Sequence, residues 1–170
     1  MPQETIRIPG THNVENYLAA ISAVWGYVSP DTIIKVAREF GGVEHRIEFV
    51  RELDGVKYYN DSIATSPTRT IAGLRSFHQK MIIIAGGYDK HIPFEPLVPV
   101  LLKRVKVLVL TGDTAQKIEA AIRKSPDYTP EALTILHAET MEEAVQKARE
   151  SAGGGDVVSL SPACASFDRY

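Results

Sequence analysis

Four short apolar runs constrain the fold of this chain more than any other feature of its sequence. The runs are residues 81–85, 105–110, 134–136 and 157–160. Most of them are followed by glycine or a hydroxyl residue, and their length and composition are typical of strands that are buried on both faces of a parallel sheet. Segments with helical spacing of apolar residues separate them, at about residues 94–102, 114–124 and 141–151. This alternation predicts an α/β fold with a doubly wound, mostly parallel sheet.

The segment before these runs predicts an antiparallel hairpin at the start of the sheet. Residues 47–53 and 56–60 are rich in apolar, β-branched and aromatic side chains. They flank Asp54-Gly55, a dipeptide that favours a tight hairpin turn. We therefore expect the parallel sheet to begin with one antiparallel pair of strands.

Two helices are expected before the sheet. Apolar residues recur with helical spacing from about residue 11 to Trp25 and again from Ser29 to Phe40. Two helices cannot bury both of their apolar faces alone, so they must pack on other parts of the protein. We therefore expect a helical segment at residues 1–43 and an α/β domain at residues 44–170.

The composition of the chain excludes several classes of function. Its 170 residues carry a formal net charge of -2, so there is no basic surplus to bind a nucleic-acid backbone. Cys164 is the one cysteine, which excludes a disulfide framework and a cysteine-rich zinc site. No apolar run is long enough to span a membrane, and residues 1–4 have no signal-peptide character. We expect a cytoplasmic protein that has neither nucleic acid nor a membrane as partner.

A polar turn separates the second hairpin strand from a helix expected to start at Pro67. Its polar side chains belong to Asn60, Asp61, Ser62, Thr65 and Ser66. At strand-to-helix turns in a parallel sheet, backbone N–H groups and side chains converge on one crevice, which favours anionic ligands. Two interpretations stay open and can coexist: a binding site, and a helix start capped by Ser66.

Two further stretches could bind anions, and each has a simpler explanation. The loop of residues 85–91 combines two glycines with Lys90, as a phosphate cradle would, but its spacing is not that of a P-loop, and Lys90 also fits a solvated loop charge. Arg46 has a planar fork that suits phosphate or carboxylate, and it also fits an ion pair with Glu44 or Glu48. His45 fits a proton donor or a structural hydrogen-bonding residue.

Asparagines near the start and small residues near the end are further candidates. Asn13 and Asn16 share one helix face, where they could grip polar groups or form an ordinary first turn. The stretch 161–168 is rich in small residues, and within it Ser166 and Phe167 could bind a polar tail and an apolar edge of a ligand. Close packing of a helix on the sheet is the alternative explanation.

Together these stretches resemble the Mur ligases and, more loosely, their folylpolyglutamate synthase relatives. The matching motifs are Gly10-Thr11-His12-Asn13-x-x-Asn16, His45-Arg46, Asn60-Asp61-Ser62-x-Ala64-Thr65, Gly86-Gly87-x-x-Lys90 and Leu160-Ser161-Pro162-Ala163-Cys164-Ala165-Ser166-Phe167-Asp168. The last string resembles the members of the family that add D-glutamate. The match covers nearly all of the chain.

The resemblance implies that the parent protein has three domains. Residues 44–170 would form its carboxy-terminal Rossmann-like domain, and residues 1–43 would be a helical remnant of its central ATPase domain. The P-loop of that central domain has no counterpart in this sequence. We therefore expect a fragment that is inactive on its own.

The resemblance also implies a reaction, namely ATP-dependent formation of an amide bond. The L-alanine carboxylate of UDP-N-acetylmuramoyl-L-alanine is phosphorylated, with Mg²⁺ neutralising charge, and the amine of D-glutamate attacks the acyl phosphate. ATP and Mg²⁺ would be bound mainly by the missing domains, and no metal ligand is expected in this chain.

By the same resemblance, each motif contributes particular residues. The residues that would help to hold the nucleotide are Asn13, Asn16, Arg46 and Asp61. The residues that would contact D-glutamate are Thr65, Lys90, Ser166 and Phe167. His45 would lie beside the reacting phosphate.

One departure from the family pattern and two other functions stay open. Ile63 stands where some members have a lysine, so either that cation is not needed or D-glutamate is held differently here. The chain could also belong to a related ligase for another amino acid, or be a stand-alone Rossmann-like module that binds a nucleotide or an amino acid. The 161–168 string favours D-glutamate, and the helices before Glu44 disfavour a stand-alone module.

Overall fold

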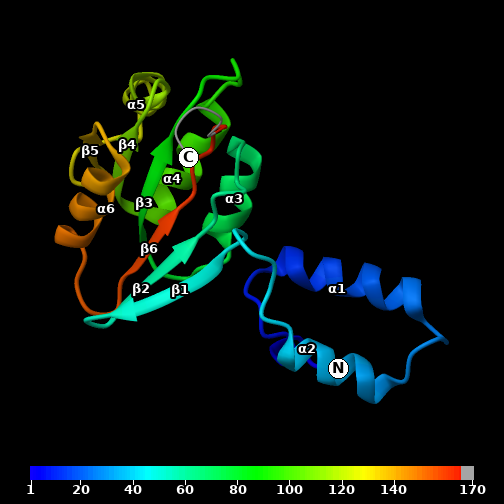
Figure 1. The fold of residues 1–170 in the computed structure, drawn as a ribbon. Coiled ribbons are helices and arrows are strands. Elements are labelled where there is room, and N and C mark those ends of the chain that lie inside the picture. The colour runs from blue at the N-terminus through cyan, green and yellow to red at the C-terminus, as the bar shows by residue number, and fades with distance from the viewer. Residues whose placement is uncertain (166–170) are drawn as a thin grey trace. The chain divides into compact units, whose positions relative to one another are not determined.

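The computed structural model describes residues 1–165 of the chain, which divides into two compact units (Figure 1). The first unit is Met1–Val43 and the second is Glu44–Tyr170. None of the helices in the described part of the chain is both long and apolar enough to cross a membrane.

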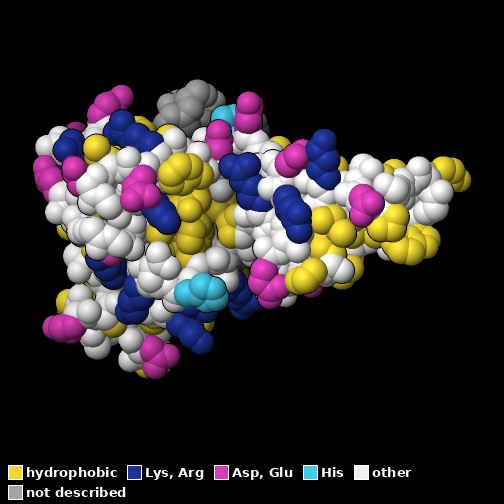
Figure 2. Space-filling view, turned by 90° about the horizontal axis from the view of Figure 1, so that it is seen from below, with side chains coloured by type: hydrophobic (Ala, Val, Ile, Leu, Met, Phe, Trp, Pro, Cys, Tyr) yellow, Lys and Arg dark blue, Asp and Glu magenta, His cyan; other side chains and the backbone are white. Residues whose placement is uncertain are grey.

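The first unit consists of helices with little core of their own. Its elements are the 3-10 helix η1 (Gln3–Thr5) and the α-helices α1 (Thr11–Val24) and α2 (Pro30–Glu39). Of its residues, Asn13 and Ala37 alone are buried, whereas Leu18, Trp25 and Tyr27 are 60%, 69% and 90% exposed. Apolar side chains accordingly appear on the surface of this unit (Figure 2). Both expected helices are present, and they leave apolar surface uncovered.

The second unit is built on one sheet that has six strands among the described residues. The strands are β1 (Glu48–Leu53), β2 (Val56–Asn60), β3 (Met81–Gly86), β4 (Val105–Thr111), β5 (Thr134–Ala138) and β6 (Val157–Leu160). Their order across the sheet is β1-β2-β6-β3-β4-β5. β1 and β2 pair antiparallel, and every other pair is parallel. The expected α/β fold with an initial antiparallel hairpin is confirmed.

Helices cover both faces of this sheet, as the order of the strands requires. The helices are α3 (Pro67–Arg75), η2 (Glu95–Leu97), α4 (Val98–Arg104), α5 (Ala115–Arg123) and α6 (Met141–Glu150). From β2 through β3 and β4 to β5 the chain moves across the sheet in one direction, so right-handed crossovers place α3, α4 and α5 on one face. The return from β5 to β6 reverses direction, and α6 therefore packs on the other face.

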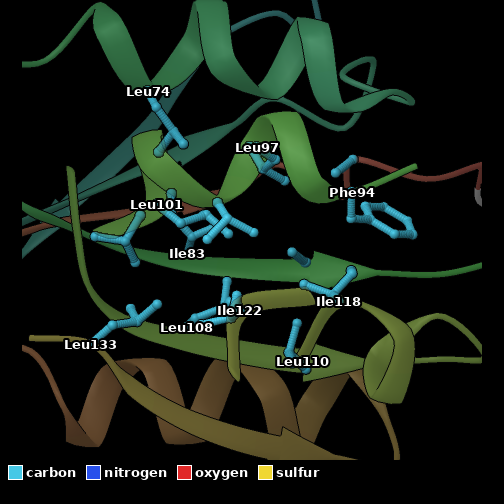
Figure 3. Packing of buried hydrophobic residues seen from close by; sticks show 14 of the residues in the cluster. Leu74, Ile83, Phe94, Leu97, Leu101, Leu108, Leu110, Ile118, Ile122 and Leu133 are labelled. Carbon is cyan, nitrogen blue, oxygen red and sulfur yellow. The ribbon is translucent and has the colours of Figure 1, made fainter. Parts of the chain in front are cut away.

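Alternate residues of the central strands supply the two layers of the core. On β3, Ile83 packs with Leu74, Leu101 and Ile118 from the helices of one face, as Figure 3 shows. Ile82 and Ile84 on the same strand pack on the opposite face with Ala144 and Ala148 of α6. All six residues of β3 are buried, which is why its sequence is continuously apolar rather than alternating.

Candidate functional site

Loops at the carboxyl ends of β2, β6 and β3 are joined by backbone hydrogen bonds. Asp61 N–H, after β2, donates to Leu160 O at 2.8 Å. Gly86 N–H, at the end of β3, donates to Pro162 O at 2.9 Å. The polar turn, the small-residue string and the glycine loop therefore meet at one edge of the sheet, where ligands of open α/β sheets bind.

The His45-Arg46 pair lies on a turn that is held by the residues after β2. We call residues 45–47 the 45–47 turn. Ile47 N–H donates to Asp61 Oδ1 at 3.2 Å, and Ile63 N–H donates to His45 O at 3.2 Å. The backbone φ angles of His45 and Ile47 are 65° and 46°. The structure thus brings together two motifs that are separate in the sequence.

Asn60 fixes the side chain of His45 in this arrangement. Asn60 Oδ1 accepts the N–H of Ser62 at 3.1 Å, so its Nδ2 faces His45 Nδ1 at 2.9 Å. Glu48, one of the glutamates expected to pair with Arg46, instead accepts the backbone N–H of His45 at 2.9 Å. Because Asn60 Nδ2 is a donor, Nδ1 of neutral His45 is the acceptor and its proton lies on Nε2.

Asp61 is a buried carboxyl group at the centre of this region. It is 4% exposed, and its second oxygen accepts the hydroxyl of Ser161 at 3.0 Å. Burial raises the pKa of Asp61 from 3.8 to about 6, while the hydrogen bonds from Ser161 and Ile47 and the charge of Arg46 act in the opposite direction. The ionised form is therefore costly in the folded chain.

Asp61→Asn is expected to make the chain more stable at pH 7.5 than at pH 4, relative to the unsubstituted chain. The pKa of Asp61 is raised on folding, so its contribution to stability is fully present below pH 3.8 and is lost as the pH rises through about 6. The difference in unfolding free energy between the two chains should grow by up to about 3 kcal/mol across this range. Urea unfolding of both chains at the two pH values measures it, and a difference that does not change with pH would contradict the raised pKa.

The two glycines after β3 are explained by contacts within the chain. Gly86 has a φ of 113°, and a Cβ there would lie 1.9 Å from Thr111 O. Gly87 has a φ of 150°, and a Cβ there would lie 2.5 Å from Ala165 O. The close backbone approach expected of this loop is thus made to the neighbouring loops, and a phosphate ligand is not needed to account for it.

Lys90 lies on an exposed part of the same loop, next to a residue that fixes the loop in place. Asp89 accepts the backbone N–H of His91 at 2.7 Å and both of its oxygens lie 3.1 Å from Lys117 Nζ. These two contacts lower the pKa of Asp89. The loop is therefore tied to α5 immediately beside Lys90.

Cys164 is a buried thiol in the described part of the small-residue string. It is 3% exposed, and its Sγ lies 3.1 Å from Thr114 Oγ1. Burial raises the pKa of Cys164 to about 11, which keeps the thiol neutral near pH 7. This environment suits a small packed side chain and not a nucleophile.

The two asparagines of the first unit share one face of α1, as expected. Asn13 Nδ2 donates to Pro9 O at 2.6 Å, and Asn16 Nδ2 donates to Asn13 Oδ1 at 3.3 Å. Gly10, with a φ of 103°, occupies the position before the helix. Asn13 is buried and Asn16 is exposed, so the carboxamide of Asn16 is the more accessible one.

The residues expected to contact D-glutamate are described only in part. Thr65 is half-buried at the same sheet edge, and its N–H donates to Ile63 O at 2.8 Å. Ser66 occupies the N-cap position of α3, as expected, but its side chain forms no capping hydrogen bond there. Ser166 and Phe167 lie outside the described residues.

Sequence reasoning did not single out two hydroxyl residues of this site. Ser161 Oγ lies 3.0 Å from Asp61 Oδ2 and 3.2 Å from Thr70 Oγ1, and all three residues are buried. The available signal was that Ser161, like Asp61, directly follows a strand. A contact between residues about a hundred positions apart has no local signature.

Two other features of the structure bear on ligands. Within residues 1–165 there is no group of three or more His, Cys, Asp or Glu side chains that could hold a metal ion. A cavity of about 780 Å³ opens beside β4 and β5, and none of the expected site residues that the structure describes lines it. Its Lys147 and Glu143 pair with each other at 2.6 Å.

Comparisons with known proteins find relatives that match nearly all of this chain but are much longer than it. Residues 45–164 match the family model described as Mur ligase, glutamate ligase domain. The UDP-N-acetylmuramoylalanine--D-glutamate ligase of Clostridium perfringens is 52% identical over 168 residues, which are 99% of this chain and 37% of that protein. The protein of the same name from Acetivibrio thermocellus is 58% identical over 167 residues, 97% of this chain and 36% of that protein. The chain thus spans little more than a third of these relatives.

Solved structures share the fold at low sequence identity. Mycobacterium tuberculosis folylpolyglutamate synthase complexed with ADP has a TM-score of 0.67 at 14% identity, over 92% of this chain and 39% of that one. A pseudomurein peptide ligase type C from Methanothermus fervidus has a TM-score of 0.65 at 18% identity, over 89% of this chain and 33% of that one. At such identities the likeness establishes the fold alone.

Proposed function

The chain belongs to the Mur ligase family, and from that premise we propose that it is the carboxy-terminal part of an ATP-dependent ligase that joins D-glutamate to UDP-N-acetylmuramoyl-L-alanine. The observation that carries the proposal is the identity of 52% and 58% to two curated D-glutamate ligases over nearly the whole chain. The reaction belongs to peptidoglycan synthesis, and we assign it to the cytoplasm. Residues 1–43 are proposed to belong to the central ATPase domain, and residues 44–170 to be the carboxy-terminal Rossmann-like domain.

The proposed reaction has two steps. The γ-phosphoryl group of ATP passes to the L-alanine carboxylate, which gives an acyl phosphate and ADP. The amine nitrogen of D-glutamate then attacks the acyl carbon, the amide bond forms, and phosphate leaves while the amine loses its excess protons. Mg²⁺ would neutralise charge on the phosphates, and no step here is assigned to a metal ligand from this chain, whose described residues hold no group of three or more His, Cys, Asp or Glu side chains that could bind a metal ion.

On the nucleotide side we propose roles for Asn13, Asn16, Arg46, Asp61 and His45. Arg46 is exposed, and its guanidinium suits the base and phosphates. His45 is exposed as well, with Nδ1 facing Asn60, so its Nε2–H is the donor available to a phosphate oxygen beside the reacting atoms. The carboxamides of Asn13 and Asn16 are proposed to hold polar groups of the nucleotide.

On the amino-acid side we propose contacts from Thr65, Lys90, Ser166 and Phe167. The ammonium group of Lys90 would pair with a carboxylate of D-glutamate. The side chain of Ile63 cannot replace the lysine cation that some family members have at this position. Its backbone nevertheless makes two hydrogen bonds: the N–H donates to His45 O, and the carbonyl oxygen accepts a hydrogen bond from Arg69 Nη1 at 3.1 Å. Ile63 thus supports the turn whichever side chain it carries.

A titration of the labelled 170-residue chain with D-glutamate tests this side of the proposal. Amide-resolved NMR should show shifts at Thr65 and Lys90 with D-glutamate and weaker or no shifts with L-glutamate, because the proposed contacts fix both carboxylates of one enantiomer. Equal responses to the two enantiomers, or responses confined to loops away from the carboxyl edge of the sheet, would contradict it.

A further inference from the structure

The 45–47 turn has a backbone conformation that needs outside support. His45 and Ile47 have φ angles of 65° and 46°, in the left-handed region that residues other than glycine rarely adopt. The region is least favourable for a β-branched residue such as Ile47. Strained conformations of this kind persist where surrounding contacts over-determine them, and they cluster at functional sites.

Asp61 provides the buried support for this turn. Ile47 is 8% exposed and its N–H donates to Asp61 Oδ1 at 3.2 Å. If this acceptor were lost, the N–H would be left buried without a partner, which is costly for the folded chain. The second oxygen of Asp61 is engaged from the other side by Ser161 Oγ at 3.0 Å.

A second row of contacts holds Asp61 itself in position. Ser161 Oγ lies 3.2 Å from Thr70 Oγ1 on α3, and Thr70 Oγ1 donates to Ala64 O at 3.4 Å. On the same helix, a Cβ on Gly73 would lie 2.7 Å from Asp61 Oδ2, so glycine leaves the room that the carboxylate occupies. Both oxygens of Asp61 are therefore used inside the chain.

We propose that Asp61, Ser161 and Thr70 are positioning residues that hold the 45–47 turn and thereby orient Arg46 and His45 toward the nucleotide. The inference rests on the proposed function for the identity of the ligand. It gives Asp61 a role through the turn in addition to its proposed place on the nucleotide side. Ser161 and Thr70 gain a role in the reaction that their sequence positions do not indicate.

The charged groups near Asp61 lie on or beside the 45–47 turn. Arg46 on the turn favours its ionised form, and His45 on the turn and Glu44 and Glu48 beside it are the other titratable groups of that segment. Among the described residues, the groups that α3 and the loop after β6 place against Asp61 are the hydroxyls of Thr70 and Ser161 and the glycine Gly73, none of which is charged.

Hydrogen exchange of the Ile47 amide in the labelled 170-residue chain tests the proposal. Asp61→Ala should speed this exchange at least tenfold relative to the amide of Ile83 in β3. Asp61→Asn should change it less than threefold, since asparagine can accept the Ile47 N–H and donate to Ser161 Oγ. Ser161→Ala should speed it by an intermediate amount, and Ser161→Thr, which keeps the hydroxyl, should restore it.

Thr111→Val is the matched control, because Thr111 is also a buried hydroxyl residue at the carboxyl end of a strand, β4, and does not line the small space beside Ile47 and Asp61 in the described structure. It should leave the Ile47 amide exchange unchanged. If Asp61→Ala fails to fold, the comparison of Ser161→Ala with Thr111→Val still decides whether these contacts hold the turn. If Asp61→Ala or Ser161→Ala folds and its Ile47 amide exchanges at the same rate as in the control, the proposal is overturned.

Titration with ATP and Mg²⁺ tests whether the turn matters for the nucleotide. The midpoint of the Arg46 amide shift with ATP should weaken at least fivefold in Ser161→Ala, which keeps the Asp61 carboxylate. A Ser161→Ala chain with faster Ile47 exchange but the ATP midpoint of the unsubstituted chain would overturn the link between the turn and the nucleotide. If the unsubstituted chain shows no shifts with ATP, this result counts against the nucleotide part of the proposed function. The hydrogen exchange of the Ile47 amide still decides whether Asp61 holds the turn.

The pH dependence tests the contact between Asp61 and Ile47 directly. The Ile47 amide shift should titrate with a midpoint near the pKa of Asp61, about 6, and should not do so in Asp61→Asn. A His45→Gln background removes the neighbouring imidazole from the comparison. Persistence of the titration in Asp61→Asn within that background would overturn the link between Asp61 and the turn.

Discussion

Gly86→Ala is expected to destabilise the chain by about 3 kcal/mol or more, because two costs add at this position. The backbone φ of 113° disfavours any residue with a Cβ, and that Cβ would lie 1.9 Å from the carbonyl oxygen of Thr111. Since Gly86 ends the central strand β3, neither β3 nor β4 can move aside without disturbing the core. Guanidinium unfolding followed by circular dichroism measures the loss.

Gly155→Ala is the matched control for this prediction. Gly155 also has a positive φ, 92°, but no atom of the described residues lies within 4 Å of the position that its Cβ would occupy. Its substitution therefore carries the backbone strain alone, about 1–2 kcal/mol. Equal losses for the two substitutions would mean that the strands around Gly86 adapt easily, contrary to the close contact described here.

Lys90→Ala is expected to lower kcat/KM for D-glutamate by about a hundredfold or more in a complete ligase, which corresponds to about 3 kcal/mol. The reason is that a carboxylate of D-glutamate would lose its charged partner in a closed site. The measurement needs the missing domains. A chimera in which this chain replaces the matching 36% of the Acetivibrio thermocellus relative supplies them.

Lys124→Ala in the same chimera is the control for Lys90→Ala. Lys124 lies at the end of α5 and is exposed, so its loss should change kcat/KM less than about twofold. An unchanged KM for D-glutamate in Lys90→Ala would remove Lys90 from the proposed contacts and favour the interpretation of Lys90 as a solvated loop charge.

The strands and helices of the second unit could be predicted because their signals are local. β3 is buried along its whole length, and the continuous apolar run that results is visible in the sequence. The hairpin around Asp54-Gly55 follows from turn preferences, and Asp54 indeed has a φ of 53°. The ends of one helix differ from those expected: the helix expected at about residues 94–102 is η2 followed by α4, which ends at Arg104.

The arrangement of the site could not be predicted, because it depends on contacts between distant residues. Insertion of β6 between β2 and β3 places Ser161 beside Asp61, and no local pattern encodes that order. The positive φ of Ile47 contradicts the preference of a β-branched residue, and the contact with Asp61 that accompanies it comes from a distant part of the sequence. The paired glycines suggested ligand binding, whereas the structure explains them by backbone contact between loops.

The amino-acid specificity of the unsubstituted chimera tests the central claim most directly. With ATP, Mg²⁺ and UDP-N-acetylmuramoyl-L-alanine, we expect release of ADP and formation of the amide with D-glutamate, and no amide with L-glutamate or with diamino acids. A folded chimera that binds ATP but forms no amide with D-glutamate, or that prefers another amino acid, would contradict the assignment of this chain to a D-glutamate ligase.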